Sequence, residues 1–132
     1  MTEHTSAVLS AADNLVAAFG RHDAKAYFDA FAPSATFIFH NLDRTLADRA
    51  AYEAEWALWE SRDGFRVNGC RSTGRNVQIV GKIAIFTHSV ETDLTIAGED
   101  LTNHERETIV FAHQPDGRWL AVHEHLSQLP QS

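Results

Sequence analysis

The most constraining feature of the sequence is a stretch near its end, residues 105–127, in which two runs rich in β-branched and aromatic residues flank a Pro-Asp-Gly turn at 115–117. Proline and aspartate favour tight turns, and glycine adopts the left-handed conformation that closes them. The stretch therefore predicts a β-hairpin. If Gln114 and Arg118 close a three-residue loop, positions of equal parity face one another across the two strands.

Alternation along these two strands separates the predicted hairpin into two faces. The first is apolar except at one end and consists of Arg106, Thr108, Val110, Ala112, Leu120, Val122, Glu124 and Leu126. The second carries Glu105, Glu107, Ile109, Phe111, His113, Trp119, Ala121, His123 and His125. We expect the first face to point into the fold, which would bring Arg106 and Glu124 together inside it.

Length and composition indicate one soluble globular domain spanning residues 1–132. No apolar run approaches the roughly 20 residues that cross a bilayer, and the N-terminus has no secretory signal. We therefore expect a cytoplasmic protein with no membrane partner. A net charge of −7 with scattered basic residues disfavours nucleic acid as a partner. Cys70 is the only cysteine, which excludes an internal disulfide and a cysteine-based zinc cluster.

Helical spacing of apolar residues predicts a first helix over about residues 5–19, with Thr5 or Ser6 as its N-terminal cap. Asp23 is placed to cap a short second helix over residues 24–31, because aspartate accepts hydrogen bonds from the first backbone amides of a helix. A second aspartate, Asp48, is placed to cap a third helix that runs to about Arg62, and Asp63-Gly64 ends it. The sequence thus predicts three helices in its first half.

Strand patterns predict a short strand at residues 35–40 and long antiparallel strands from residue 65 onward. Gly69 and Gly74 indicate bulges in the first long strand, and residues 83–96 alternate clearly. His88 lies on the apolar face of that strand. The length of the following turn is not fixed by the sequence, and a two-residue turn would reverse the facing of His88 relative to Arg106.

Helices followed by a run of strands predict the α+β class. We expect a cone-shaped barrel in which a strongly bent antiparallel or mixed sheet wraps around three N-terminal helices. Core residues do not fill the mouth of such a cone, so it is a natural pocket for a small ligand.

Two stretches carry a resemblance to a known family: the helix hairpin that leads through residues 28–33 into Ala35-Thr-Phe, and above all Arg106-Glu-Thr-Ile-Val-Phe with Asp116-Gly-Arg-Trp-Leu-Ala-Val-His-Glu-His-Leu-Ser127. In these stretches the chain resembles the nuclear transport factor two-like superfamily, with the closest likeness to bacterial SnoaL-like proteins. The resemblance covers nearly the whole chain in its order of elements and is specific in the C-terminal hairpin. It implies a dimeric α+β cone with a ligand between sheet and helices. The superfamily includes isomerases, cyclases, dehydratases and non-catalytic binders, so the fold alone does not give a function.

Relatives with known chemistry suggest which positions to compare. Ketosteroid isomerases place a tyrosine and a general-base aspartate where this chain has Leu15 and Phe39, and phenylalanine cannot exchange a proton. The acidic residue of cyclase relatives matches Glu124. The kinase association domain shares the Asp-Gly-x-Trp and His-x-His ending, which implies assembly rather than catalysis.

Arg106 and Glu124 are the sharpest candidate pair, because buried opposite charges need a partner, a hydrogen bond or a water-filled cavity. Arg106, with Thr108 beside it, is predicted to bind an anionic group while Glu124 accepts a proton. The alternative is a structural ion pair. His88 is the second candidate for acid–base catalysis, or else a hydrogen-bonded core histidine.

Four further residues complete the expected ligand-binding set: Phe39, His40, Tyr52 and Trp56. His40 follows a strand and would line the mouth of the cone, unless it is a plain surface residue. Tyr52 and Trp56 share one side of the third helix with Trp59, and we expect Trp56 to be the aromatic that meets the cavity; the alternative is that all three are core.

His123 and His125 point the same way from one strand and could bind one metal ion, but no third ligand accompanies them at a recognisable spacing. With Trp119 and Phe111 they instead suggest a sheet face that packs against a second subunit. We therefore expect no metal and no cofactor, and a homodimer formed through the sheet.

These observations lead to two hypotheses. The first is an isomerase, cyclase or hydratase that needs no cofactor and acts on a small, partly apolar, anionic organic ligand. The second is a non-catalytic binding or dimerisation module whose polar residues only satisfy the cavity.

Overall fold

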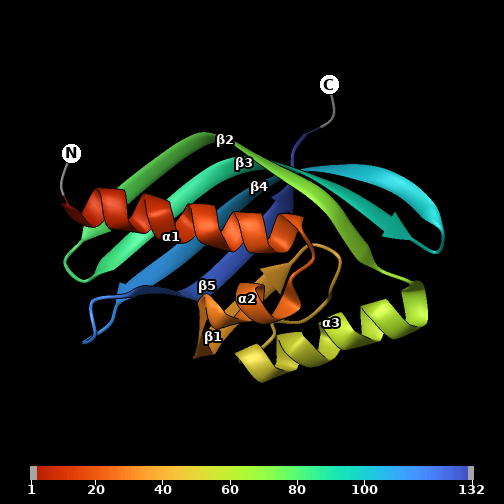
Figure 1. The fold of residues 1–132 in the computed structure, drawn as a ribbon, viewed down its shortest axis with the longest axis horizontal. Helices are drawn as coiled ribbons and strands as arrows, with labels where there is room; N and C mark the ends of the chain where they lie inside the picture. The colour runs from red at the N-terminus through yellow and green to blue at the C-terminus, as the bar shows by residue number, and fades with distance from the viewer. Residues whose placement is uncertain (1–2, 131–132) are drawn as a thin grey trace.

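The computed structural model describes residues 3–130, which form three helices and one five-stranded sheet (Figure 1). Positions 1, 2, 131 and 132, at the ends of the predicted domain and tail, lie outside the described residues. The α+β class and the curved, cone-like arrangement of sheet and helices are confirmed. The sheet does not close into a full barrel, because β1 and β2 form its two edges.

The helices are α1 (Glu3–Gly20), α2 (Ala24–Asp29) and α3 (Arg49–Asp63). Both predicted aspartate caps are present: Asp23 accepts a hydrogen bond from the Ala26 amide, and Asp48 accepts one from the Ala51 amide at 2.8 Å. Helix α1 begins before the predicted Thr5 or Ser6 cap, so that part of the prediction was wrong. Gly64 ends α3 in the left-handed conformation, with φ of 63°.

The strands are β1 (Phe31–Phe39), β2 (Arg66–Val80), β3 (Ile83–Ile96), β4 (Glu99–His113) and β5 (Trp119–Gln128). They lie in the order β1-β5-β4-β3-β2, and only the β1–β5 pair is parallel. The last strand therefore lies inside the sheet, between the first strand and the antiparallel meander. In Figure 1, α1 runs across the sheet over β2 and β3, while α3 lies apart, beyond α2 and β1.

The turn between β3 and β4 has two residues, Ala97 and Gly98, both with positive φ (53° and 80°). The sequence left this length open, and the shorter turn reverses the relative facing of the two strands. His88 consequently pairs with Glu107 rather than sharing a face with Arg106.

A bulge at Val122 shifts the register between β4 and β5. On the turn side of the bulge Phe111 pairs with Ala121, as the three-residue loop predicts, and beyond it Ile109 pairs with Glu124. The inward face of β4 is the one with Ile109 and Phe111, so our assignment of the two hairpin faces was wrong. The large aromatic side chains bury more apolar area than the valine and alanine on the other face.

The core lies between the sheet and the helices and is rich in aromatic rings. Its largest fully buried side chains include Trp56, Tyr27, Phe31, Phe37, Phe86 and Phe111. Within residues 3–130, no helix has the length and apolar character needed to cross a membrane.

Candidate functional site

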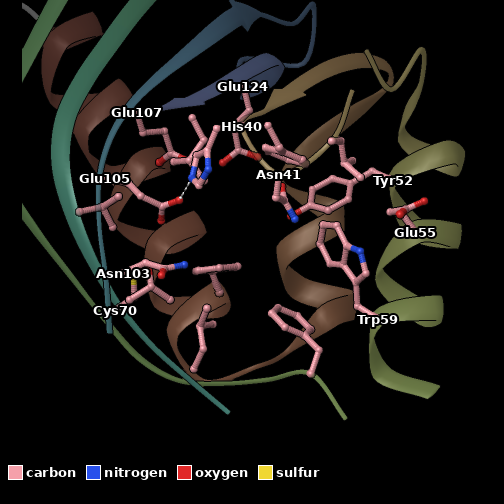
Figure 2. A pocket seen from close by; sticks show the side chains of 18 of the residues that line it. His40, Asn41, Tyr52, Glu55, Trp59, Cys70, Asn103, Glu105, Glu107 and Glu124 are labelled. Atoms are coloured by element: carbon pink, nitrogen blue, oxygen red, sulfur yellow. Dashed lines mark hydrogen bonds and ion pairs between the residues drawn. The ribbon is translucent and has the colours of Figure 1, made fainter. Parts of the chain in front are cut away.

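A cavity of about 580 Å³ opens between the sheet and the helices. Its apolar wall comes from α1, α3, the strands and the connection between α3 and β2, through Leu15, Phe19, Phe39, Tyr52, Trp59, Phe65, Val90, Leu94 and Leu126. Figure 2 shows Tyr52 and Trp59 on α3 facing Glu105, Asn103 and Cys70 across the cavity. A space of this size with several aromatic walls is suited to a small, partly apolar organic molecule.

Three buried glutamates of the sheet bring carboxyl groups to this mainly apolar cavity: Glu105 and Glu107 from β4, and Glu124 from β5. They are 4%, 7% and 3% exposed. Alternation along β4 puts the first two on one face, and the bulge at Val122 turns Glu124 toward them. Buried carboxyl groups are costly, so their hydrogen-bond partners decide which of them carry charge.

Glu124 ends a chain of buried hydroxyl groups. The Tyr27 hydroxyl donates to Glu124 Oε1 at 3.1 Å and lies 3.0 Å from the Tyr52 hydroxyl. Because Tyr27 has a single hydroxyl proton, Tyr52 donates to Tyr27. Burial, and then repulsion from Glu107, raises the pKa of Glu124 well above its ordinary value, which favours the protonated form of this carboxyl.

The carboxyl group of Glu107 contacts the imidazole of His88 on the side away from the cavity. His88 Nε2 lies 2.6 Å from Glu107 Oε1, and His88 Nδ1 lies 2.6 Å from Ser72 Oγ. His88 is 2% exposed and lies outside the cavity lining, so it contacts Glu107 without facing the cavity. Burial lowers the pKa of His88 to about 4, which leaves its ring neutral at pH 7, and burial also raises the pKa of Glu107.

His40 and Glu105 form a second imidazole–carboxyl pair, at the cavity wall. His40 Nε2 lies 2.5 Å from Glu105 Oε2, as the dashed line in Figure 2 marks. The His40 side chain is 28% exposed and that of Glu105 is 5% exposed. Within residues 3–130, His40 Nδ1 makes no hydrogen bond, so it is free to meet a ligand.

The arginines near the cavity are already paired. Arg44 contacts Glu55 at 2.8 Å, and Arg62 contacts Asp63 at 2.8 Å. The described lining therefore presents carboxyl groups and neutral polar groups in its interior rather than an unpaired cation. This arrangement disfavours an anionic ligand deep in the cavity.

The structure brings together some of the predicted site residues and separates others. Phe39, His40, Tyr52 and Glu124 line the cavity. Arg106 and Thr108 lie on the other face of β4, Arg106 exposed and Thr108 half-buried, so their predicted place in the cone was wrong. The cause is the reversed facing of the hairpin. Leu15 also lines the cavity.

Trp56 is likewise absent from the cavity lining; it is a core residue, 2% exposed, packed on Tyr27, Phe28 and His22. Trp59, one helical turn later on α3, lines the cavity where Trp56 was expected. The expectation failed because i and i+3 positions share a helix face, and the sequence does not say which of them meets solvent-filled space.

Two of the four predicted interface residues are buried inside the fold. Phe111 and Trp119 are 0% and 6% exposed and belong to the core, so their predicted place on an outer face was wrong. His123 and His125 lie on the outer side of β5, where His123 Nδ1 is 2.8 Å from Thr36 Oγ1. Among the described residues, no group of three or more His, Cys, Asp or Glu side chains is arranged to hold a metal ion.

Several site residues escaped prediction, namely Tyr27, Trp59, Ser72, Glu105 and Glu107. Glu105 and Glu107 have the same parity as Ile109 and Phe111, and the burial of those two large side chains was the available signal. Tyr27 follows the Asp23 cap within a short helix, and nothing local distinguishes it from a core tyrosine. Ser72 is recognisable only from its contact with His88.

Comparison with known proteins gives a family and a fold. A family model described as a SnoaL-like domain matches residues 8–131. Among solved structures, a ketosteroid isomerase-like protein from Erwinia carotovora atroseptica SCRI1043 aligns with a TM-score of 0.82 and 15% identity, over 99% of this chain and 100% of that one. No curated protein matches the chain.

Two further structures illustrate how varied the similar proteins are. A candidate dehydratase of the NTF2-like family from Streptomyces avermitilis aligns with a TM-score of 0.78 and 17% identity, over 96% of this chain and 97% of that one. A candidate calcium/calmodulin-dependent protein kinase II association domain from Xanthomonas campestris aligns with a TM-score of 0.76 and 20% identity, over 95% and 87%. At these identities the likeness shows the fold alone.

Proposed function

The chain belongs to the SnoaL-like domain family, and we propose that it binds a small, partly apolar, uncharged organic molecule in its cavity and moves a proton on it without a cofactor. The reaction would be of the isomerase, cyclase or hydratase type. The observation that carries this proposal is the buried carboxyl pair Glu107 and Glu124, which opens on an apolar cavity and is backed by Tyr27.

The chemistry follows from the protonation of these groups. A protonated Glu124, held by Tyr27, can donate to a carbonyl oxygen of the ligand, because a neutral carboxyl in an apolar site is a good hydrogen-bond donor. A neighbouring base then removes a proton from the carbon next to that carbonyl. The electron pair of the broken C–H bond forms a C=C bond, and the oxygen takes the proton of Glu124 to give an enol.

Two groups on the cavity wall are placed to act as the base, Glu107 and the His40–Glu105 pair. The His40 imidazole is oriented by the Glu105 carboxyl group, and its Nδ1 is free to take a proton from the ligand. Carboxyl, phenol and imidazole groups together supply all the proton transfers in this scheme.

The predicted preference for an anionic ligand is replaced by one for an uncharged ligand. The anionic preference depended on Arg106, which lies on the outer face of β4. An anion deep in the cavity would face three glutamates, whereas a ketone, an aldehyde or an alcohol would accept hydrogen bonds from Glu124 and the amides of Asn41 and Asn103.

A non-catalytic binding or assembly module is the second candidate, and the similarity to a candidate association domain favours it. In either case we propose a cytoplasmic homodimer formed through the outer face of the sheet. His125 lies there between Ile38 of β1 and Thr108 of β4 in one row across three strands.

Isotope exchange tests the catalytic proposal without knowledge of the product. A panel of enolisable ketones is incubated with the protein in D₂O, and deuterium entry next to the carbonyl is followed by NMR. We expect at least one ketone to exchange faster with the wild-type protein than with Glu124→Gln, which keeps the size of the side chain but cannot release a proton. Arg106→Ala is the matched control and should exchange like wild type.

Thermal-shift measurements with the same ketones, aromatic alcohols and small carboxylic acids test binding separately. Uncharged compounds should raise the melting temperature more than carboxylic acids at pH 7. Binding without exchange in any ketone would favour the non-catalytic module, and a preference for carboxylates would contradict the proposed ligand class.

A further inference from the structure

Ser72, His88, Glu107 and Glu124 contribute one side chain from each of four neighbouring strands, β2 to β5, to a continuous polar row. We propose that Ser72 and His88 are positioning residues that fix how charge is divided in the carboxyl pair, with Glu107 as the carboxylate and Glu124 as the neutral acid. This assignment rests on the proposed function in that it gives each carboxyl its role toward the ligand.

The first argument concerns His88. Its ring is neutral at pH 7, and a neutral imidazole carries only one N–H. Within the described residues its two nitrogens have one partner each, Ser72 Oγ on Nδ1 and Glu107 Oε1 on Nε2. The proposed assignment takes the Ser72 hydroxyl as the donor to Nδ1, which puts the ring proton on Nε2, toward Glu107.

The second argument comes from the other end of the row. The tyrosine hydroxyls donate in series toward Glu124, so Glu124 Oε1 is an acceptor. Burial raises the pKa of both carboxyl groups, and repulsion from Glu107 raises that of Glu124 further, so the retained proton is assigned to Glu124. Glu107 therefore accepts hydrogen bonds from His88 on one side and from Glu124 on the other. A group that only accepts hydrogen bonds is a carboxylate, so Glu107 carries the negative charge.

The surroundings of His88 agree with this direction. Its other close neighbour is the Phe86 ring, with the centroids 4.7 Å apart, and the charge of Arg75 also acts on it. The positive charge of Arg75 opposes a second positive charge on His88. His88 thus supports a negative charge on Glu107 as a neutral donor, not as an ion-pair partner.

The consequence is an unequal pair. Glu107 would take the proton from the ligand carbon, and Glu124 would give one to the ligand oxygen. Two ionised carboxyl groups buried side by side would repel each other. Two neutral carboxyl groups would leave the site without a base.

Ligand-free protein is sufficient for the test. Nitrogen-15 NMR of the histidine rings, with the His88 signals assigned through His88→Gln, should show a proton on Nε2 and none on Nδ1 at pH 7. Infrared spectra should show one protonated buried carboxyl, which disappears in Glu124→Gln. A ring proton on Nδ1, or two protonated carboxyl groups in wild type, would overturn the assignment.

Ser72 is tested by a matched pair of variants. Ser72→Ala removes the hydroxyl and should shift the His88 ratio of Nε2–H to Nδ1–H by roughly fivefold, the equivalent of one ordinary hydrogen bond. Ser72→Thr keeps the hydroxyl and should retain the wild-type ratio. An unchanged ratio in Ser72→Ala contradicts the positioning role. Because no ligand is used, these results are independent of whether any ketone exchanges.

Discussion

A carboxyl group that cannot reach water holds its proton at a pH where an exposed one has lost it, and Glu124 is in this situation. In the folded state its pKa lies well above the ordinary value of 4.5. The folded protein then binds more protons than the unfolded chain between pH 4.5 and that raised pKa, so the free energy of unfolding falls as pH rises through this range.

Glu124→Gln should remove this pH dependence, because the amide stays neutral while still accepting from Tyr27. We expect the variant to be more stable than wild type at pH 8 and to lose less stability than wild type between pH 5 and pH 8. Urea denaturation at pH 5 and pH 8 measures the difference. Glu99→Gln changes an exposed glutamate and should leave the pH dependence as in wild type.

Cys70 offers a second prediction at the residue scale. It lines the cavity, and burial raises the pKa of its thiol to about 12. Because the thiolate is the reactive form, alkylation of the folded protein at pH 8 should be much slower than that of the urea-unfolded chain. Iodoacetamide labelling followed by mass spectrometry measures both rates, and equal rates would show that the thiol is not held in this state.

Individual site residues were only partly predictable from the sequence. Phe39, His40 and Tyr52 line the cavity, and strand ends and helix periodicity are the signals that locate them; Glu124 lines it too. The predicted inward position of Glu124 agrees with the structure only because two errors cancel. The prediction exchanged the two faces of the hairpin, and it lacked the bulge at Val122 that returns Glu124 to the inward face. Arg106 had no such compensation and lies outside.

Among the elements, those with strong local signals were predicted best. Aspartate caps, the glycine after α3 and the alternating residues 83–96 all appear in the structure as expected. Register was harder, because a change of one residue in a turn or a bulge exchanges the two faces of a strand. The short turn after β3 and the bulge in β5 are such changes, and together they determine which carboxyl groups meet.

The turn between β3 and β4 provides a prediction at the element scale. Ala97 has φ of 53°, a conformation that costs most residues energy but that asparagine tolerates. Ala97→Asn, which creates the Asn-Gly pair favoured in two-residue hairpins, should stabilise the protein by about 0.5–1 kcal/mol. Thermal denaturation tests this, with Ala97→Val, whose branched side chain fits this conformation poorly, as the variant that should lose stability.

At the scale of the whole molecule, the proposed homodimer places the outer face of the sheet against a second copy. Ile38 is 36% exposed and lies beside His125 on that face. Ile38→Asp should shift the protein toward monomers at micromolar concentration, because burying a carboxylate in an apolar part of an interface costs more desolvation free energy than it regains. Analytical ultracentrifugation gives the mass.

The matched control is Leu58→Asp on α3, which changes an equally apolar and exposed residue away from the sheet, 43% exposed, and should leave the mass unchanged. A wild-type protein that sediments as a monomer would contradict the dimer, whatever the variants do.

The position of β5 inside the sheet affects how the protein reaches its structure. Its partners β1 and β4 belong to opposite halves of the chain, and in the described part of the chain β1 has no other long strand beside it. During synthesis the sheet cannot be completed until β5, the last strand, has been made. Pairings between segments that are distant in the sequence also form slowly. The cavity carboxyls would thus come together late in folding, and loss of the final strand would leave β1 unpaired.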